Sequence, residues 1–133
     1  FDYIIDLDVT SPLREISDIS QAFNQFVKDE NDNLFSVSHA KKNPYFNLVQ
    51  RNTKGEITLV KKNDKSVLRR QDAPKCYEMN ASIYIWKRQI LKNKKTIFLK
   101  NTGIYLMPEE RSIDIDSMFD YEIVKFIYEN KKC

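Results

Sequence analysis

The chain has 133 residues, of which 41% are hydrophobic and 31% charged, values that exclude a disordered chain and indicate one domain with a single core. Its 22 basic and 19 acidic residues give a net charge of +3, which is too small to indicate nucleic acid as a partner. No apolar run is long enough to span a membrane. The isolated Cys76 and Cys133 provide neither a disulfide framework nor a zinc site, so we expect a reduced, cytoplasmic setting.

The chain opens with the pattern of a strand, a helix and a second strand. Residues 3–7 form an apolar run typical of a buried parallel strand, and a polar turn follows at 8–14. Apolar residues at helical spacing predict a helix over 19–27, and residues 34–38 have the composition of the second strand. This order of elements predicts a parallel sheet with a right-handed crossover.

A hairpin pattern interrupts this rhythm between residues 43 and 62. Two alternating segments, 45–51 and 56–61, are joined by the turn residues 52–55, and several lysines accompany them. We expect this region to project from the sheet. Because a two-stranded arm is marginally stable in water by itself, it should pack on a second subunit. The candidate contact residues are apolar: Phe46, Leu48, Ile57 and Leu59.

The remaining elements alternate between strand and helix. β-branched and aromatic residues predict a strand over 81–86, and a short helical stretch follows at 87–92. Segments 97–99 and 103–107 are further strand candidates. Helical spacing of apolar residues over 119–127 predicts a closing helix, so the fold class is α/β.

Asp114 and Asp116 are the candidate chemical centre of the chain. In an extended segment their carboxylates face one side while Ile113 and Ile115 pack on the other. Neighbouring carboxylates repel each other, so the arrangement favours a hard divalent cation such as Mg2+, which binds oxygen ligands and often completes its shell with substrate phosphates. Alternatively, the two acids are simply solvated or cap the helix that follows.

Four stretches, in this order and at this spacing, resemble the acylneuraminate cytidylyltransferases, the CMP-N-acetylneuraminic acid synthetase family. They are DVTSPLR at 8–14, NPYF at 43–46, RQDAP with NASIY between 70 and 84, and SIDID at 112–116. The resemblance covers essentially the whole chain. It implies transfer of CMP from CTP to the anomeric hydroxyl of a sialic acid-type nonulosonic acid, with release of pyrophosphate. It also implies a Rossmann-like nucleotidyltransferase sheet, mostly parallel with helices on both faces, a Mg2+ requirement, and a homodimer with a protruding hairpin arm.

The same resemblance implies roles for individual residues. Asp114 and Asp116 match the catalytic, metal-binding acids. The positions that match the sugar-acid site are polar or aromatic: Arg70, whose fork would grip the sugar's carboxylate, Gln71, Asn80, Tyr84 and Phe98, with Ile97 beside the acyl group. The positions that match nucleotide contacts lie in the first turn: Ser11 and Arg14.

Each of these residues also has a structural interpretation. Asn80 could make a hydrogen bond at a strand edge, and Tyr84 and Phe98 could pack in the core, as aromatic residues at strand spacing usually do. Arg14 could hold the turn in place instead of binding phosphate. The sequence leaves these alternatives open.

One part of the family pattern is missing from this sequence. The first strand and the glycine-containing nucleotide loop would precede Phe1, and the two glycines present, Gly55 and Gly103, are not in a phosphate loop. We therefore expect residues 1–133 to be one partial domain, the C-terminal part of the enzyme, inactive by itself. The alternatives are a non-catalytic remnant that acts as a dimerisation or binding module, and a related cytidylyltransferase for another sugar acid.

Overall fold

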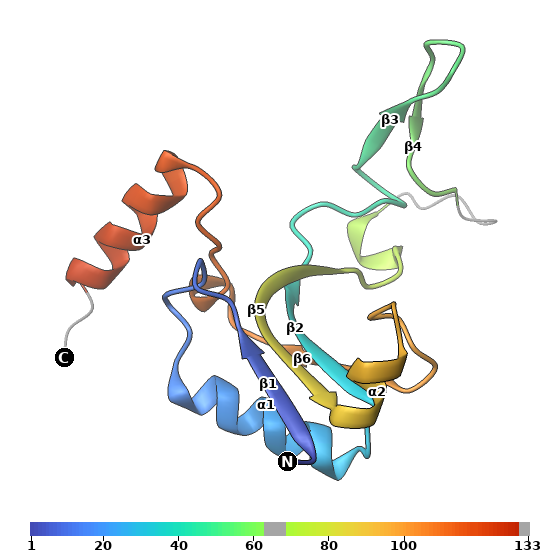
Figure 1. Ribbon diagram of the computed structural model, residues 1–133. Coiled ribbons are helices and arrows are strands. Elements are labelled where there is room, and N and C mark those ends of the chain that lie inside the picture. Colours follow the sequence, from blue (N-terminus) through green and yellow to red (C-terminus); the bar gives the residue numbers. More distant parts are fainter. Residues whose placement is uncertain (63–68, 131–133) are drawn as a thin grey trace. The chain divides into compact units, whose positions relative to one another are not determined.

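The computed structural model describes residues 1–62 and 69–130, which belong to two compact units (Figure 1). The first unit comprises Phe1–Ser38 and Met79–Cys133, and the second comprises His39–Glu78. A four-stranded sheet with helices forms the first unit, whereas a two-stranded sheet lies within the second. The predicted mixed α/β class is therefore confirmed.

The four-stranded sheet has the order β1 (Tyr3–Leu7), β5 (Tyr77–Lys87), β2 (Asn33–His39), β6 (Thr102–Leu106). β1 pairs with β5 in antiparallel orientation, whereas β2 and β6 are a parallel pair. The sheet is mostly antiparallel, so the expectation of a mostly parallel, Rossmann-like sheet is not supported. The strand–helix–strand pattern fixes only the local connection, and it cannot show that β5, from a distant part of the chain, lies between β1 and β2.

β1 corrects a second expectation, that of a buried parallel strand. It lies at the edge of the sheet, where it has a single neighbouring strand. Tyr3 is 44% exposed and Leu7 is 37% exposed. The apolar run correctly predicted a strand, but a continuous apolar run does not distinguish an edge position from a central one.

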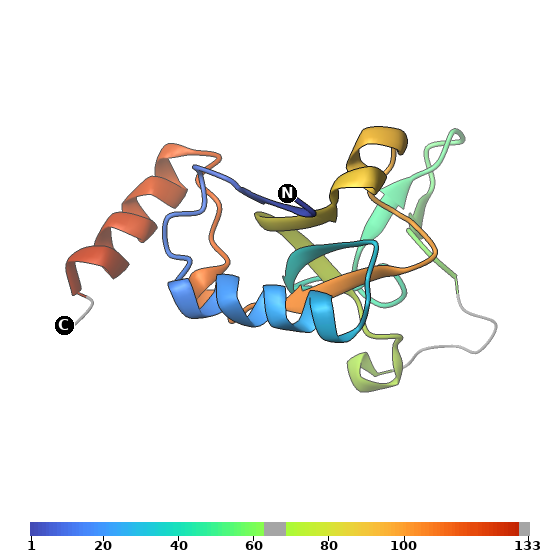
Figure 2. The same cartoon turned by 60° about the horizontal axis from the view of Figure 1, so that its bottom comes forward.

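α1 (Ile16–Lys28) covers one face of the sheet, as the helical periodicity predicted (Figure 2). Its Phe26 and Ala22 are fully buried, and the ring of Tyr3 packs edge-on against Phe23 and Phe26. Burial of these apolar side chains stabilises the helix on the sheet. The shared core is apolar throughout: Ala22, Phe26, Leu34, Ile83, Ile85, Tyr105 and Met107.

Two further predicted helices are present, α2 (Arg88–Asn93) and α3 (Met118–Asn130). No helix among the described residues is both long and apolar enough to cross a membrane. The strand expected at 97–99 is absent, and side chains instead occupy its backbone groups. Asn33 Nδ2 donates to the Ile97 carbonyl at 2.7 Å, and the Leu99 N–H donates to Thr102 Oγ1 at 2.7 Å.

The predicted hairpin is present but shorter than expected, with β3 at Val49–Arg51 and β4 at Ile57–Leu59. Asn52 organises its turn, because its Oδ1 accepts hydrogen bonds from two backbone N–H groups, those of Lys54 and Glu56, both at 2.9 Å. Gly55 has a φ of 83°, a left-handed conformation that glycine adopts without strain. Packing of this hairpin on a second subunit stays a prediction.

Candidate functional site

Tyr84 lies on the face of the sheet opposite α1, which we call the aromatic face because it carries Phe35 and Tyr84. Register places Tyr84 directly across from Asp6, so both side chains share this face, whereas Ile83 and Ile85 point into the core. The Phe35 ring centroid lies 6.4 Å from that of Tyr84 and 6.0 Å from that of Phe98. Tyr84 and Phe98, predicted separately, are thus linked through Phe35.

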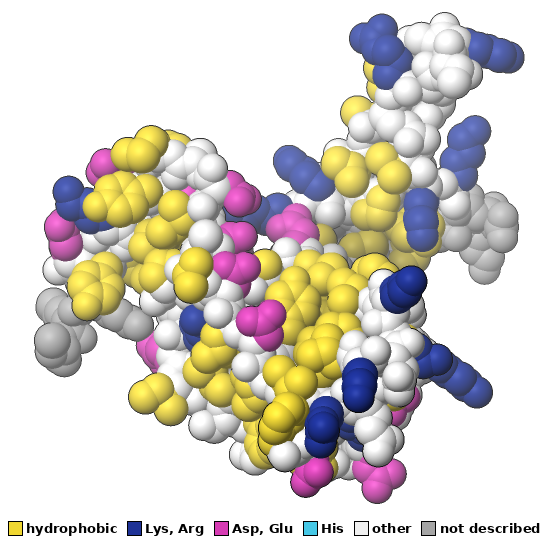
Figure 3. All heavy atoms as spheres, in the orientation of Figure 1, with side chains coloured by type: hydrophobic (Ala, Val, Ile, Leu, Met, Phe, Trp, Pro, Cys, Tyr) yellow, Lys and Arg dark blue, Asp and Glu magenta, His cyan; other side chains and the backbone are white. Residues whose placement is uncertain are grey.

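Nearby carboxylates influence the Tyr84 hydroxyl electrostatically. Burial raises the pKa of Tyr84, and the negative charges of Asp8, Asp6 and Asp114 raise it further. The pKa of the Asp8 carboxyl changes in the opposite direction: hydrogen bonds from the N–H and hydroxyl of Thr10 to Asp8 Oδ1 lower it. Figure 3 shows acidic side chains bordering an apolar surface on this unit.

The acidic segment 112–116 belongs to neither a helix nor a strand. It lies beside the first turn, because the Ile115 N–H donates to the Thr10 carbonyl at 3.0 Å. Asp114 is half-buried, and its Oδ1 is buried with no hydrogen-bond partner among the described residues. Asp116 is exposed. The two acids therefore have different environments, with Asp114 facing inward and Asp116 facing solvent.

These residues fit a Mg2+ ion bound mainly by its substrate. In the part of the chain that the structure describes, no three His, Cys, Asp or Glu side chains converge as a metal cage. A buried carboxylate oxygen without a partner, as in Asp114, is costly unless a ligand satisfies it. Mg2+ is commonly held by one or two carboxylates and completed by water and phosphates, and the Asp114 carboxylate could supply one such ligand.

Asn80 lies at the centre of a buried hydrogen-bond network. Its Oδ1 accepts from the Ser36 hydroxyl at 2.6 Å and from the Ser82 N–H at 3.3 Å. Its Nδ2 donates to Ser112 Oγ at 3.0 Å. The next residue, Ala81, has a φ of 53°, which brings the Asn80 side chain and the Ser82 N–H together. Asn80 thus connects β2, β5 and the start of the acidic segment, and its role in sugar binding stays a prediction.

Ser11 and Arg14 fasten the first turn to the same network. The buried Ser11 hydroxyl donates to the Asn80 carbonyl at 3.3 Å. Arg14 Nη1 donates to the Ser82 carbonyl at 2.6 Å, and Nη2 donates to the Asp8 carbonyl at 3.0 Å. The structural alternative that the sequence left open for Arg14 is present in this geometry. Nucleotide binding by either residue stays a prediction.

A second anchor lies just before the acidic segment, between Arg111 and Asp18. Two nitrogens of Arg111 donate to the two carboxylate oxygens of Asp18, both at 2.9 Å. Asp18 is fully buried in the first turn of α1, where its Oδ2 also accepts the Glu15 N–H at 2.9 Å. Burial opposes ionisation of this carboxyl, but hydrogen bonds from Arg111 and Glu15 outweigh burial and lower its pKa.

Arg70 and Gln71 belong to the second unit, so the structure does not bring them together with the residues above. They begin a short 3-10 helix, Arg70–Asp72. Gln71 is exposed, and the side chain of Arg70 lies outside the described part of the structure. Their predicted contacts with the sugar acid stay predictions.

Several curated proteins are similar to this chain over most of its length. A relative from Campylobacter coli, named post-translational flagellin modification protein B, is 45% identical over 131 residues, 98% of this chain and 54% of the relative. One from Campylobacter jejuni subsp. jejuni serotype O:2, named CMP-N,N'-diacetyllegionaminic acid synthase, is 46% identical over 128 residues, 96% of this chain and 53% of the relative. An N-acylneuraminate cytidylyltransferase from Streptococcus agalactiae serotype III is 32% identical over 115 residues, 86% of this chain and 27% of the relative.

The chain is related to the acylneuraminate-type cytidylyltransferases. It spans about half the length of the two Campylobacter relatives. No family model matches the sequence. The similarity to these relatives confirms, as a family relationship, the resemblance recognised from the ordered motifs.

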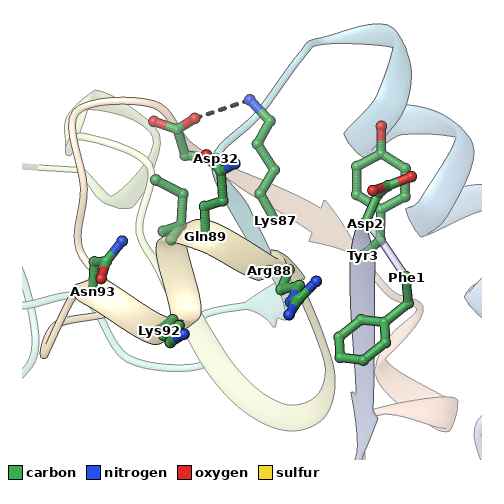
Figure 4. Close-up of a pocket in the computed structure, with 10 residues that line it drawn as sticks. Phe1, Asp2, Tyr3, Asp32, Lys87, Arg88, Gln89, Lys92 and Asn93 are labelled. Atoms are coloured by element: carbon green, nitrogen blue, oxygen red, sulfur yellow. Dashed lines mark hydrogen bonds and ion pairs between the residues drawn. The ribbon is translucent and has the colours of Figure 1, made fainter.

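Within this cytidylyltransferase relative, a separate pocket of about 640 Å3 lies where β1 begins and β5 runs into α2 (Figure 4). Lys87 forms an ion pair with Asp32 at its wall, with Nζ and Oδ1 2.9 Å apart. The Arg88 guanidinium lies over the Phe1 ring, 4.9 Å from its centroid. None of the predicted site residues lines this pocket, so it is distinct from the candidate site.

Several residues of the candidate site were missed by sequence reasoning. Asp6 could have been found, because alternation along β1 places it on the face opposite the core-facing residues. Asp8 directly follows this strand and had no such signal. Phe35 could be found only with knowledge of the strand order, because it contacts Tyr84 and Phe98 only when β2 and β5 lie side by side. The pairing of Asp18 with Arg111 had no local signal, because 93 residues separate them.

Proposed function

We propose that this chain is part of a cytidylyltransferase that transfers CMP from CTP to the anomeric hydroxyl of a sialic acid-type nonulosonic acid. In this reaction the sugar oxygen forms a bond to the α-phosphorus of CTP, the bond to pyrophosphate breaks, and the hydroxyl proton is released. The observation that carries the proposal is the 46% identity, over 96% of this chain, to a protein named CMP-N,N'-diacetyllegionaminic acid synthase.

The geometry of the first unit is compatible with this chemistry. Asp114 and Asp116 would hold Mg2+, which would neutralise charge on the phosphates. Asp114 has a carboxylate oxygen free for such a role. Phosphoryl transfer depends mainly on positioning and on charge neutralisation, and it needs no covalent participation by the protein.

The aromatic face supports sugar binding in the same way. Phe98 is 67% exposed, and its ring packs against Phe35, which in turn contacts Tyr84. Exposed rings offer apolar surface to the acyl groups and ring carbons of a sugar, while the Tyr84 hydroxyl offers a hydrogen bond. Arg70 would bind the carboxylate of the sugar, as the family resemblance implies.

Among sugar acids, we propose a diacetyllegionaminic-type substrate ahead of a pseudaminic-type one. The relative named for the first substrate is 46% identical to this chain, whereas a pseudaminic acid cytidylyltransferase from Campylobacter jejuni subsp. jejuni serotype O:23/36 is 25% identical over 129 residues. Substrate preference depends on the groups that line the pocket, and these diverge as identity falls.

The direct test uses the protein expressed from its complete reading frame. It is incubated with CTP, Mg2+ and either N-acetylneuraminic, N,N'-diacetyllegionaminic or pseudaminic acid, and the CMP-sugar is detected by mass spectrometry. We expect product with at least one of the three acids and the highest kcat/KM with the diacetylated legionaminic acid. Product with none of them would refute the proposed reaction. Faster transfer to pseudaminic acid would refute the substrate assignment alone.

Asp116→Asn provides the first specific prediction. The exposed carboxylate becomes a neutral amide of the same shape, so the fold should be retained while kcat falls by about 100-fold or more, as for loss of one preorganised electrostatic group. Asp29→Asn, which changes an exposed acid at the end of α1, is the matched control. Near-normal CMP-sugar formation by Asp116→Asn at saturating Mg2+ would contradict the metal assignment.

A further inference from the structure

Among the described residues the acidic segment has no strand partner, yet both of its ends are attached to the rest of the first unit. Ser112 is tied to Asn80 through its hydroxyl, and the Ile115 N–H is tied to the Thr10 carbonyl. Beyond it, Asp120 accepts hydrogen bonds from the N–H and hydroxyl of Ser117 at 2.8 and 2.6 Å. The position of Asp114 and Asp116 therefore depends on a few discrete contacts and not on a ladder of backbone hydrogen bonds.

The strongest of these contacts lies immediately before the segment. Arg111 ends the short 3-10 helix Glu109–Arg111, and its fork binds both oxygens of the fully buried Asp18. Tyr105 Oη adds a longer hydrogen bond to Asp18 Oδ1 at 3.4 Å. Because Asp18 is fixed in the first turn of α1, the fork transmits the position of that helix to residue 111, three residues before Asp114.

We propose that Arg111, through its paired hydrogen bonds with Asp18, is a positioning residue that sets where the two acids meet the metal and its phosphates. This inference rests on the function proposed above. Arg111 itself touches neither metal nor substrate and acts only through residues 112–116. A planar fork with two parallel hydrogen bonds fixes direction as well as distance, which a lysine ammonium cannot do.

The experiment compares four variants of the protein expressed from its complete reading frame, one of which, Arg111→Lys, keeps the charge at this position but loses the fork. Arg111→Met removes the fork but leaves the buried Asp18 charge without its ion-pair partner. Asp18→Asn combined with Arg111→Met removes the ion pair without leaving that charge behind. Lys87→Met is the matched control, because it breaks an ion pair whose N···O distance is also 2.9 Å but which lies by the pocket of Figure 4, away from the acidic segment.

Two readouts separate positioning from stability. Hydrogen exchange at the Ile115 amide reports whether the segment stays on Thr10, and the half-saturating Mg2+ concentration of CMP transfer reports how the acids are placed. In the Asp18→Asn/Arg111→Met variant we expect Ile115 to exchange at least about tenfold faster and half-saturation to rise about tenfold, a size that a small misplacement can produce. Lys87→Met should leave the Ile115 exchange rate and the half-saturating Mg2+ concentration unchanged. Arg111→Lys should change each of them less than the double variant does.

The outcomes distinguish the two proposals. If wild-type protein forms CMP-sugar but the double variant keeps wild-type exchange at Ile115 and wild-type Mg2+ dependence, the positioning role is wrong and the proposed function stands. A double variant that only melts at a lower temperature also refutes the positioning role, because it reveals a structural contact alone. Wild-type protein that forms no CMP-sugar overturns the proposed function, and the role of Arg111 with it.

Discussion

Asn80 illustrates, at the scale of the residue, how a buried polar group can hold distant segments together. Its amide exchanges hydrogen bonds with Ser36 and Ser112, and its carbonyl accepts the Ser11 hydroxyl. A buried amide with all its partners costs little, whereas removing it leaves several groups without partners at once.

Asn80→Ala should therefore destabilise the protein by about 2–3 kcal/mol, because the Ser36 hydroxyl and the Ser82 N–H lose their acceptor inside the core. Urea unfolding followed by circular dichroism measures the loss. Asn93→Ala, at the exposed end of α2, is the control and should change the free energy of unfolding by no more than about 0.5 kcal/mol. Equal effects of the two substitutions would show that the network contributes nothing.

Asp18 makes stability depend on pH. Its folded-state pKa lies below the ordinary value of 3.8, so its ionised form stabilises the fold above about pH 4, and that contribution disappears as the pH falls through the folded-state pKa. Asp18→Asn should cost about 3 kcal/mol at pH 7, as expected when a buried pair loses one partner, and less at pH 3. Thermal unfolding across this pH range provides the measurement.

Asp120→Asn is the comparison for this prediction. The Ser117 hydroxyl also lowers the pKa of Asp120, but this carboxylate is close to solvent and water competes for it. Its pH-dependent contribution should be smaller than that of Asp18. A wild-type protein whose stability advantage over Asp18→Asn is constant from pH 7 to pH 3 would contradict the assignment.

The sequence indicated candidate site residues but not the contacts that hold them in place. Two acids separated by one isoleucine were recognisable as a candidate metal pair, and Tyr84 matched a sugar-acid position of the family. The partners of Asn80 lie 44 and 32 residues away, so no local pattern indicates them. No local pattern indicated that Asp18 would be the buried partner of Arg111.

At the scale of the element, β6 shows how closely a strand can approach a neighbouring turn. A Cβ added at Gly103 would collide with the side-chain amide of Asn31, which is itself buried. β6 therefore reaches its place beside β2 only because residue 103 has no side chain. This is a requirement for space, unlike that of Gly55, where the backbone conformation is left-handed and the surroundings are open.

Gly103→Ala should accordingly cost about 1–3 kcal/mol, the usual range for overpacking. Asn31→Ala in the same chain removes the colliding amide and should recover part of that loss. Gly55→Ala should cost about 1 kcal/mol for a different reason, the strain of a positive φ, and no second substitution should relieve it. Differential scanning calorimetry of the four proteins checks both explanations. No recovery in the Gly103→Ala/Asn31→Ala variant would exclude the collision.

Elements were predictable where local periodicity alone decides them. The helix over 19–27 and the closing helix over 119–127 both formed, because their apolar residues recur at helical spacing. The strand predicted at 97–99 was wrong, because a short apolar run also occurs in loops whose backbone groups bond to side chains. The direction and order of the strands were not predictable from local pattern, because β5 pairs with a strand some 80 residues earlier in the chain.

At the scale of the whole molecule, charge is divided unevenly along the chain. Residues 39–78 contain ten lysines and arginines against four aspartates and glutamates, although the net charge of the chain is only +3. The hairpin within this unit also exposes Val49 and Ile57, which are 58% and 59% accessible. An exposed apolar strand pair with basic neighbours is a candidate for association, consistent with the predicted dimer arm.

We predict that the protein expressed from its complete reading frame is a homodimer through this hairpin. Val49→Lys combined with Ile57→Lys should shift it to monomer at micromolar concentration, because lysines on both strands replace apolar surface with like charge. Sedimentation velocity measures the change. Phe98→Lys, which alters an exposed apolar residue of the other unit, is the control and should leave the mass unchanged. A wild-type monomer would refute the arm.

The left-handed conformation of Ala81 constrains how this chain can evolve. This conformation interrupts the alternation of side chains between the two faces of β5. The residues after Ala81 therefore point to their present faces only while the strand keeps this residue. A deletion here would move Ile83 and Ile85 out of the core and turn Tyr84 into it. Related chains are therefore expected to exchange side chains on the aromatic face while the length of β5 stays constant.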